Sequence, residues 1–407
     1  LEQLLGRQAT GFGFVAFGDT VFNLAYYQTI GMMKEELLAA VPLFIFMGFI
    51  TEQAGLMERL FTAFRLLLAP IRGALFAVVI LTAAVFAMAT GIVGAAVTVL
   101  GIMASPIMVK TGYDARLSAG AITAGGTLGI LIPPSVMLIV MGPVLGVSVA
   151  DLYAAAFGPG LLLAALYLGY LLARAFFNPR LGPPVPREER IYGVGRILRE
   201  VFLGVVPLLG LIAATLGSIL AGLATPTEAS GIGALGALIL AASYRKLTYA
   251  GLKRAVLSTT ATASMVLFLA VTSNVFGAVF ARMGSANWIT ESMLALNFSP
   301  VLMLVTVLLL IFLLGWPFEW PAIVLVFLPI FYPVMNELKP ALGVSLGIEP
   351  DMVLVWFGAL VAVVLQTAFL SPPVAMSAYY LRQVLKDWSL ANIYHGMFQF
   401  MILQVFA

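Results

Sequence analysis

Two runs of the sequence place adjacent prolines inside long apolar stretches. Residues 128–142 read LGILIPPSVMLIVMG, with Pro133 and Pro134 at the centre, and residues 366–380 read QTAFLSPPVAMSAYY. Proline has no backbone N–H and clashes with the preceding helical turn, so each pair is expected to break a helix. In a membrane, the carbonyls freed by a break are costly unless protein or a cavity covers them. Two such breaks predict a site where unwound backbone faces ions and a substrate.

The residues around the two breaks carry oxygen atoms that suit a hard cation. A hard cation prefers oxygen ligands, and a carbonyl whose N–H partner is replaced by proline stays free to bind one. The alternative is that the glycines only allow close helix packing and the prolines only kink. Two breaks in one chain favour ion sites. The predicted ligands are Thr90, Gly91, Gly94, Gly126, Thr127, Gly129 and Pro133 in the first set, and Gly315, Pro317, Gln366, Thr367 and Ser371 in the second.

An anionic substrate would be attracted to the positive N-terminal ends of half-helices. These ends are expected after the breaks, at Ser135 and Val374, and near 94–96 and 320–322. No Lys or Arg stands out in the apolar interior, so a substrate carboxylate would depend on helix dipoles, hydroxyls and a bound cation. The predicted substrate contacts are Ser135, Pro134, Pro372, Pro373 and Glu319.

Two carboxylates, Glu319 and Glu228, lie next to predicted apolar segments. Glu319 is either a buried functional carboxylate or part of a segment that reaches an outer aqueous cavity. Glu228, in the run TPTEAS, is expected to sit at a helix N-terminus after Thr225 or Thr227.

The elements that must position these residues are membrane helices. The chain has 407 residues, of which 62% are hydrophobic and 10% are charged, whereas a soluble domain is about a quarter charged. We therefore expect an all-α polytopic membrane protein. The absence of cysteine and the single histidine argue against a disulfide, a transition-metal site or thiol catalysis. The chain begins with Leu rather than Met, which suggests a trimmed N-terminus.

Four apolar segments are shorter than a bilayer requires. Segments 74–90 and 95–108 are joined by TGIVG, and segments 300–316 and 320–335 are joined by GWPFEWP. A spanning helix needs about 20 residues, so each pair is expected to enter the membrane and return by the same face.

The distribution of basic residues indicates from which side of the membrane each hairpin enters. Seventeen of the 21 Lys and Arg residues fall in 59–72, 110–116, 174–199, 245–254 and 382–386, and basic loops face the cytoplasm. This topology brings the first hairpin in from the cytoplasm and the second from outside. The order of hairpin, turn and Pro-Pro break thus occurs twice with opposite orientation, which is typical of transporters with inverted repeats.

The same pattern divides the chain into five regions. The predicted divisions are 1–73 for N-terminal scaffold helices, 74–147 for the first transport unit, 148–281 for scaffold helices and arms, 282–387 for the second transport unit, and 388–407 for a C-terminal helix that continues past the end of the sequence.

Several runs resemble a known family. They are TAGGTLGILIPPS at 123–135, VPLFIFMGFITEQAGL at 41–56, ATPTEAS at 224–230 and LQTAFLSPPVAMSAYYL at 365–381. Over roughly 36–407 the chain is similar to the large membrane subunit of TRAP (tripartite ATP-independent periplasmic) transporters.

The resemblance implies a multi-pass protein of the inner membrane that imports small organic acids by a sodium-driven elevator motion. It implies two partners, a small four-helix membrane subunit and an extracytoplasmic substrate-binding protein, and no bound cofactor or nucleic acid. One departure concerns the first hairpin tip. Many relatives carry SGSS there, whereas this chain reads TGIVG at 90–94. Sodium at this tip would therefore depend more on backbone carbonyls, or the site is altered.

Other functions fit less well. A proton-coupled organic-anion transporter of related architecture stays open, although clustered intramembrane carboxylates are scarce. A pump within this chain would need an ATP-binding motif, and none is present. A membrane-embedded enzyme would need a nucleophile with a base or several metal ligands, which one histidine and no cysteine do not supply.

Overall fold

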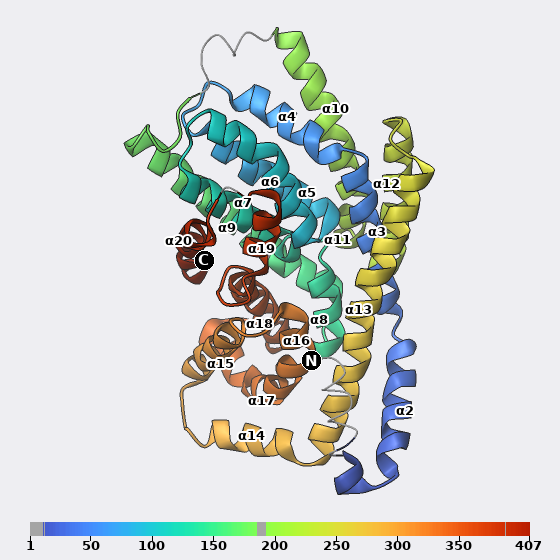
Figure 1. Cartoon of the computed structure of the whole chain (residues 1–407). Coiled ribbons are helices and arrows are strands. Elements are labelled where there is room, and N and C mark those ends of the chain that lie inside the picture. The colour runs from blue at the N-terminus through green and yellow to red at the C-terminus, as the bar shows by residue number, and fades with distance from the viewer. Residues whose placement is uncertain (1–10, 12, 185–192, 387) are drawn as a thin grey trace.

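The computed structural model describes residues 11, 13–184, 193–386 and 388–407, and helices are their only regular secondary structure (Figure 1). Within these ranges, seven helices are long and apolar enough to cross a membrane. The number becomes eight if α7 (Ala115–Leu131) and α8 (Val136–Leu145) form one bent span. The prediction of a polytopic α-helical membrane protein is confirmed.

One group of helices comes from the N-terminal and middle parts of the chain. Within it, α3 packs on α12 and α13, and α4 packs on α10. The long helix α13 runs along much of the height of the molecule (Figure 1). The bounds of this group are α2 (Thr20–Met33), η1 (Glu36–Ala39), α3 (Ala40–Gln53), α4 (Leu56–Leu68), α10 (Val194–Ile212), η3 (Ala213–Gly217), α11 (Ser218–Leu220), α12 (Pro226–Ser243) and α13 (Tyr249–Arg282).

The start of α12 confirms the expected role of Glu228. The Thr225 hydroxyl accepts a hydrogen bond from the Glu228 N–H at 3.2 Å, and a Glu228 carboxylate oxygen accepts one from the Thr225 N–H at 2.8 Å. This reciprocal capping box satisfies two N–H groups that the helix leaves unpaired. Thr227 also donates to the Glu36 carbonyl, which ties this end of α12 to η1.

The first Pro-Pro motif interrupts a helix as predicted. The hairpin arms α5 (Ala74–Thr90) and α6 (Val93–Lys110) both pack on α7. The chain then leaves helical geometry until Ser135, and α8 continues at an angle of 44° to α7. The Pro133–Pro134 peptide bond is cis.

The same order of elements recurs near the C-terminus, around a second cis Pro-Pro bond at Pro372–Pro373. Both α15 and α17 pack on α18. In Figure 1 the arms α5 and α6 lie in the upper half of the molecule, and α15 and α17 lie in the lower half. The bounds here are α15 (Pro300–Leu314), α16 (Trp320–Ala322), η4 (Ile323–Phe327), α17 (Leu328–Leu346), α18 (Pro350–Leu365), η5 (Gln366–Phe369) and α19 (Met376–Val384).

The half-helices that follow the breaks pack across two groups of helices, α5–α8 around the first break and α15–α19 around the second. After the first break, α8 contacts α17, α18 and η4. After the second break, α19 contacts α6 and α7. Each half-helix therefore packs against the group that contains the other break, and the two groups share one core.

The remaining helices cover these elements. The long helix α9 (Val149–Phe177) packs on α5, α7 and α18, and α20 (Leu390–Phe406) packs closely on α7. The short helix α14 (Ser285–Leu294) connects α13 to α15 and contacts α17.

The prediction that both arms of each hairpin are too short to cross a membrane was wrong for the second arm of each hairpin. Helix α6 has 18 residues, and Trp320–Leu346 is a continuous helical stretch of 27 residues. Both are long and apolar enough to cross a membrane. The first arms α5 and α15 are shorter, with 17 and 15 residues. The second arm of the second hairpin is longer than the predicted segment 320–335 because the helix continues through Pro340 to Leu346.

Candidate functional site

The tip of the first hairpin lies directly on the first break. Only Gly91 and Ile92 separate α5 from α6, and Gly91 has φ +60°. A Cβ built on Gly91 would lie 3.3 Å from the Pro134 carbonyl oxygen and 3.7 Å from the Gly129 carbonyl oxygen. Glycine is needed here both for the left-handed turn and for the close approach. The tip thus brings the backbone of Gly91 next to the carbonyl of Gly129, a predicted ion ligand, and that of Pro134, a predicted substrate contact.

Helix α3 covers this tip from the side of α12 and α13. A Cβ on Gly48 would lie 2.8 Å from the Thr90 carbonyl oxygen and 3.1 Å from the Thr90 Cα. Any larger residue at Gly48 would therefore push α3 away from the tip. Gly48 lies in the run FMGF and was missed from the sequence, although a glycine in an apolar helix is a known sign of close packing.

The first break is completely covered by protein. Pro133, Pro134 and Ser135 are all buried. The Ser135 hydroxyl donates to the Ile130 carbonyl at 2.5 Å, and the Ser135 carbonyl accepts a hydrogen bond from the Tyr153 hydroxyl at 3.3 Å. Tyr153, on α9, also escaped the sequence analysis. These bonds give the non-helical backbone partners that the lipid could not supply.

The second break has a row of polar groups on its upstream side. Thr367 donates to the Val364 carbonyl at 2.7 Å, and Ser371 donates to the Thr367 carbonyl at 2.7 Å. A hydroxyl that donates its proton keeps oxygen lone pairs, so both can still accept a cation. The Gln366 amide nitrogen donates weakly to the Ala362 carbonyl at 3.4 Å.

The Gln366 side-chain oxygen is buried and has no hydrogen-bond partner among the described residues. Gln366 is 0% exposed, so water does not satisfy this oxygen from outside. An unpaired buried acceptor costs free energy, and a bound cation would remove that cost. Of the predicted ligands in the second set, Gln366 therefore fits a cation best.

The second hairpin tip also lies beside its own break. A Cβ on Gly315 would lie 3.2 Å from the Ala368 Cβ, in the turn η5 that leads into the break. Unlike the first tip, this region is open. Pro317, Glu319, Pro372 and Pro373 are all exposed. The exposure of Glu319 agrees with the interpretation that this tip reaches an aqueous space.

Tyr380 of α19 packs against the first hairpin. A Cβ on Gly94, in the first turn of α6, would lie 3.0–3.3 Å from three atoms of the Tyr380 ring. Glu319 in the second tip lies in the neighbourhood of Tyr380. Tyr380 was not predicted as a site residue, although it ends the second Pro-Pro run. Gly94 therefore faces α19 from inside α6 instead of belonging to the tip loop.

The structure separates Thr127 from the hairpin tip. Gly125, Gly126 and Gly129 form the face of α7 that meets α5 and α6. Thr127 points elsewhere: its hydroxyl donates to the Ala124 carbonyl at 2.9 Å and contacts the Tyr167 hydroxyl on α9. Thr127 therefore belongs to the packing of α7 on α9.

Ser377 is a further polar group near the second break that the sequence analysis missed. It lies in the first turn of α19, is 0% exposed, and its hydroxyl has no partner within the described part of the chain. An unsatisfied hydroxyl at a helix N-terminus can donate to an anion.

Two solved structures share this fold. The YdaH transporter of Alcanivorax borkumensis matches with a TM-score of 0.64 and 18% identity over 96% of this chain and 86% of that chain. MtrF of Neisseria gonorrhoeae matches with a TM-score of 0.58 and 14% identity over 95% and 82%. At these identities the similarity establishes the fold alone.

Sequence relatives identify the family. The chain is 30% identical over 392 residues to the C4-dicarboxylate TRAP transporter large permease protein DctM of Rhodobacter capsulatus, covering 92% of this chain and 84% of the relative. It is 29% identical over 369 residues to the sialic acid TRAP transporter large permease protein SiaM of Vibrio cholerae, covering 90% and 82%. These relatives are transporter permease subunits and not enzymes. Residues 3–407 match the DctM component of the tripartite ATP-independent periplasmic transporters. The chain therefore belongs to this family, and it is a large permease subunit that passes several times through the inner membrane.

Proposed function

We propose that this chain is the translocating subunit of a secondary-active importer that carries small organic acid anions together with sodium. The observation that carries the proposal is the contact of each hairpin tip with its own Pro-Pro break, at Gly91 against Pro134 and at Gly315 against Ala368. The named relatives transport C4-dicarboxylates and sialic acid, which are all organic acids.

Each break supplies oxygen ligands for one cation in this proposal. At the first break the Gly129 and Pro134 carbonyls lie beside the Gly91 turn. At the second, the Gln366 side-chain oxygen and the Thr367 and Ser371 hydroxyls are available. The acid would bind between the tips, where the cations and the N-terminus of α19 with Ser377 offset its negative charge. Both sodium ions are transported together with the substrate and are released with it.

The contacts favour an elevator motion. The α5–α8 and α15–α19 groups are joined by their exchanged half-helices, and α9 and α20 pack on them, so these elements would move as one body. This assignment departs from the sequence division, which placed α9 among the scaffold helices. Helices α3, α12 and α13 would form the static scaffold, with a small membrane subunit packed on it and an extracytoplasmic binding protein docked above. The inverted orientation of the two groups is part of the same proposal.

The test is uptake of a radiolabelled C4-dicarboxylate or sialic acid into proteoliposomes that contain the chain, its small membrane subunit and its binding protein. Uptake should rise with external sodium and should not follow a pH gradient at fixed sodium. Uptake that ignores sodium and follows the pH gradient would replace sodium with protons. Full uptake by the purified chain alone would refute the need for both partners.

A further inference from the structure

A cavity lies away from the two Pro-Pro breaks, between the scaffold and the second hairpin. Its volume is ≈ 530 Å³, within the range of about 300–1,000 Å³ typical of small-molecule sites. It is lined by α2 and α13 on one side and by the end of α8, η4 and α17 on the other. Its lining includes none of the residues proposed to bind sodium or the acid.

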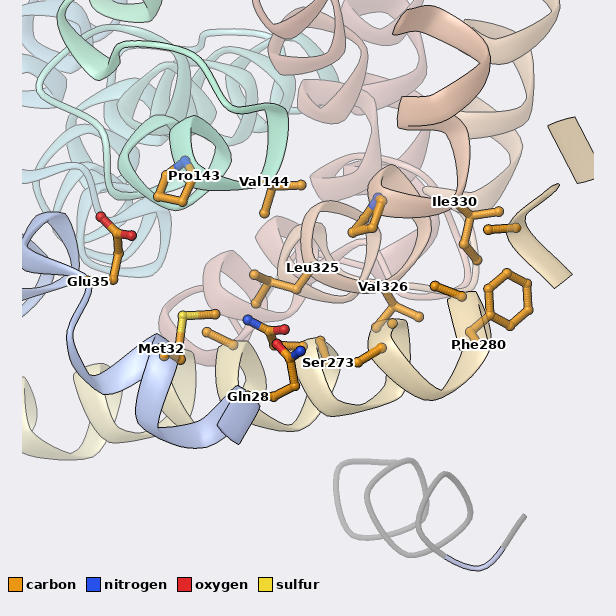
Figure 2. A pocket seen from close by; sticks show the side chains of 18 of the residues that line it. Gln28, Met32, Glu35, Pro143, Val144, Ser273, Phe280, Leu325, Val326 and Ile330 are labelled. Carbon is orange, nitrogen blue, oxygen red and sulfur yellow. The ribbon is translucent and has the colours of Figure 1, made fainter. Parts of the chain in front are cut away.

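The two walls of the cavity differ in chemistry. The scaffold wall carries Gln28, Ser273 and Asn274, with Glu35 at one end. The opposite wall is apolar and includes Leu325 and Val326 of η4. Figure 2 shows Gln28 and Ser273 close together on the floor of the cavity, and the Glu35 carboxylate on the side of Pro143.

The polar wall has unused hydrogen-bonding capacity. None of the side chains of Gln28, Glu35, Ser273 and Asn274 hydrogen-bonds or pairs with another residue in the described ranges. Ser273 is 4% exposed, so its hydroxyl faces the cavity and little else. Glu35 is the one charged residue in the lining as the structure describes it. A wall with a carboxylate and no basic group repels an organic acid, so the transported anion does not suit this cavity.

We propose that this cavity binds a lipid of the surrounding bilayer with a primary ammonium headgroup, namely phosphatidylethanolamine. A primary ammonium donates three hydrogen bonds. The Glu35 carboxylate and the amide oxygens of Gln28 and Asn274 are the matching acceptors. The apolar wall of η4 and α17 would receive part of an acyl chain, which stays in apolar surroundings when it moves there from the bilayer.

The lipid would bridge two bodies that slide past each other in the elevator motion. Occupancy would therefore hold the observed arrangement and slow transport. This consequence rests on the proposed function, whereas binding itself does not, and the test reads binding directly.

Two glycines provide a matched pair of variants. A Cβ added to Gly277 or to Gly231 meets no atom within 4 Å, so a side chain can begin at either position without a clash. Gly277 lines the cavity from α13, and Gly231 lies on α12 outside it. Gly277→Leu should fill the cavity, and Gly231→Leu controls for a new leucine on a scaffold helix. Glu35→Gln removes the charge and keeps the side-chain shape.

The experiment is native mass spectrometry of the full chain with equimolar phosphatidylethanolamine and phosphatidylglycerol of identical acyl chains. The wild type and Gly231→Leu should retain the ammonium lipid over the glycerol lipid by about fivefold, the scale of one partly exposed ion pair. Glu35→Gln should bind both lipids equally, and Gly277→Leu should retain neither. The proposal is overturned if the wild type shows no preference, or if the preference survives in both Glu35→Gln and Gly277→Leu.

Discussion

The Cβ position of Gly91 lies 3.3 Å from the Pro134 carbonyl oxygen, so the first hairpin tip and the first break touch through backbone. Gly91 also has φ +60°, where an L side chain costs about 1–2 kcal/mol. Gly91→Ala should strain the turn and move the tip off the break. We expect the sodium concentration for half-maximal uptake to rise about tenfold, the equivalent of 1.4 kcal/mol.

Gly112→Ala is the control for this variant. Gly112 has φ +75°, but its Cβ position has no neighbour within 4 Å. It shares the backbone strain of Gly91→Ala without the close contact, so it should lower the unfolding temperature less and leave the sodium dependence unchanged. Equal sodium dependence in both variants would show that the contact between tip and break has no part in ion binding.

The orphan oxygen of Gln366 gives a second prediction. Gln366→Leu should raise the sodium concentration for half-maximal uptake about tenfold if this oxygen binds the ion, since a ligand contact is worth about 1–2 kcal/mol. Gln404→Leu is the matched control, because Gln404 is also buried with an unpartnered side-chain oxygen but lies on α20. If Gln366→Leu raises the unfolding temperature and leaves the sodium dependence unchanged, the unpaired oxygen only destabilises the fold and does not bind sodium.

The two hydroxyls before the second break give a third prediction. Replacing Thr367 and Ser371 together by valine keeps the fold, since each change is small. It should weaken apparent sodium affinity by about 1–2 kcal/mol, the value of one lost hydrogen-bond-strength contact. The measurement is uptake against external sodium with the binding protein present.

Thr127→Val is the comparison for that double variant. The Thr127 hydroxyl faces Tyr167 on α9, away from the hairpin tip. We expect a lower unfolding temperature and an unchanged sodium dependence. A sodium effect in Thr127→Val with none in the double variant would reverse the assignment of the two hydroxyl sets.

A fourth prediction concerns the packing of Gly94 against Tyr380. Gly94→Ala would place a methyl group 3.0 Å from the Tyr380 ring and should lower both stability and uptake. Tyr380→Leu in the same chain should restore part of the loss, because the smaller side chain makes room. A double-mutant cycle on unfolding temperature and uptake measures this coupling, and additive effects would argue against direct contact.

The breaks themselves were predictable from sequence because proline acts locally. A pair of prolines removes two adjacent N–H groups, and the helix ended before Pro133 and before Pro372, whereas single prolines such as Pro333 stay within a helix. The identity of the tip was also predictable, because Gly91 follows an apolar run and opens another.

The orientation of α7 about its own axis was not predicted, although the spacing of its glycines indicates which face meets the hairpin. Gly125 and Gly129 are four residues apart and share a helix face, whereas Thr127 lies about 200° away from Gly129. Counting this periodicity would have placed Thr127 opposite the hairpin. The contacts of Tyr153 and Tyr380 could not be predicted in this way, because they depend on which helices become neighbours.

The exchange of α8 and α19 between the two groups has a consequence for biogenesis. The chain enters the membrane from its N-terminus, so α8 is present before η4, α17 and α18 exist to receive it. The surface of α6 and α7 that receives α19 stays uncovered until residue 384 has been made. The first half of the protein must wait in the bilayer in an unfinished state, and neither half can complete its core unless the other is inserted beside it.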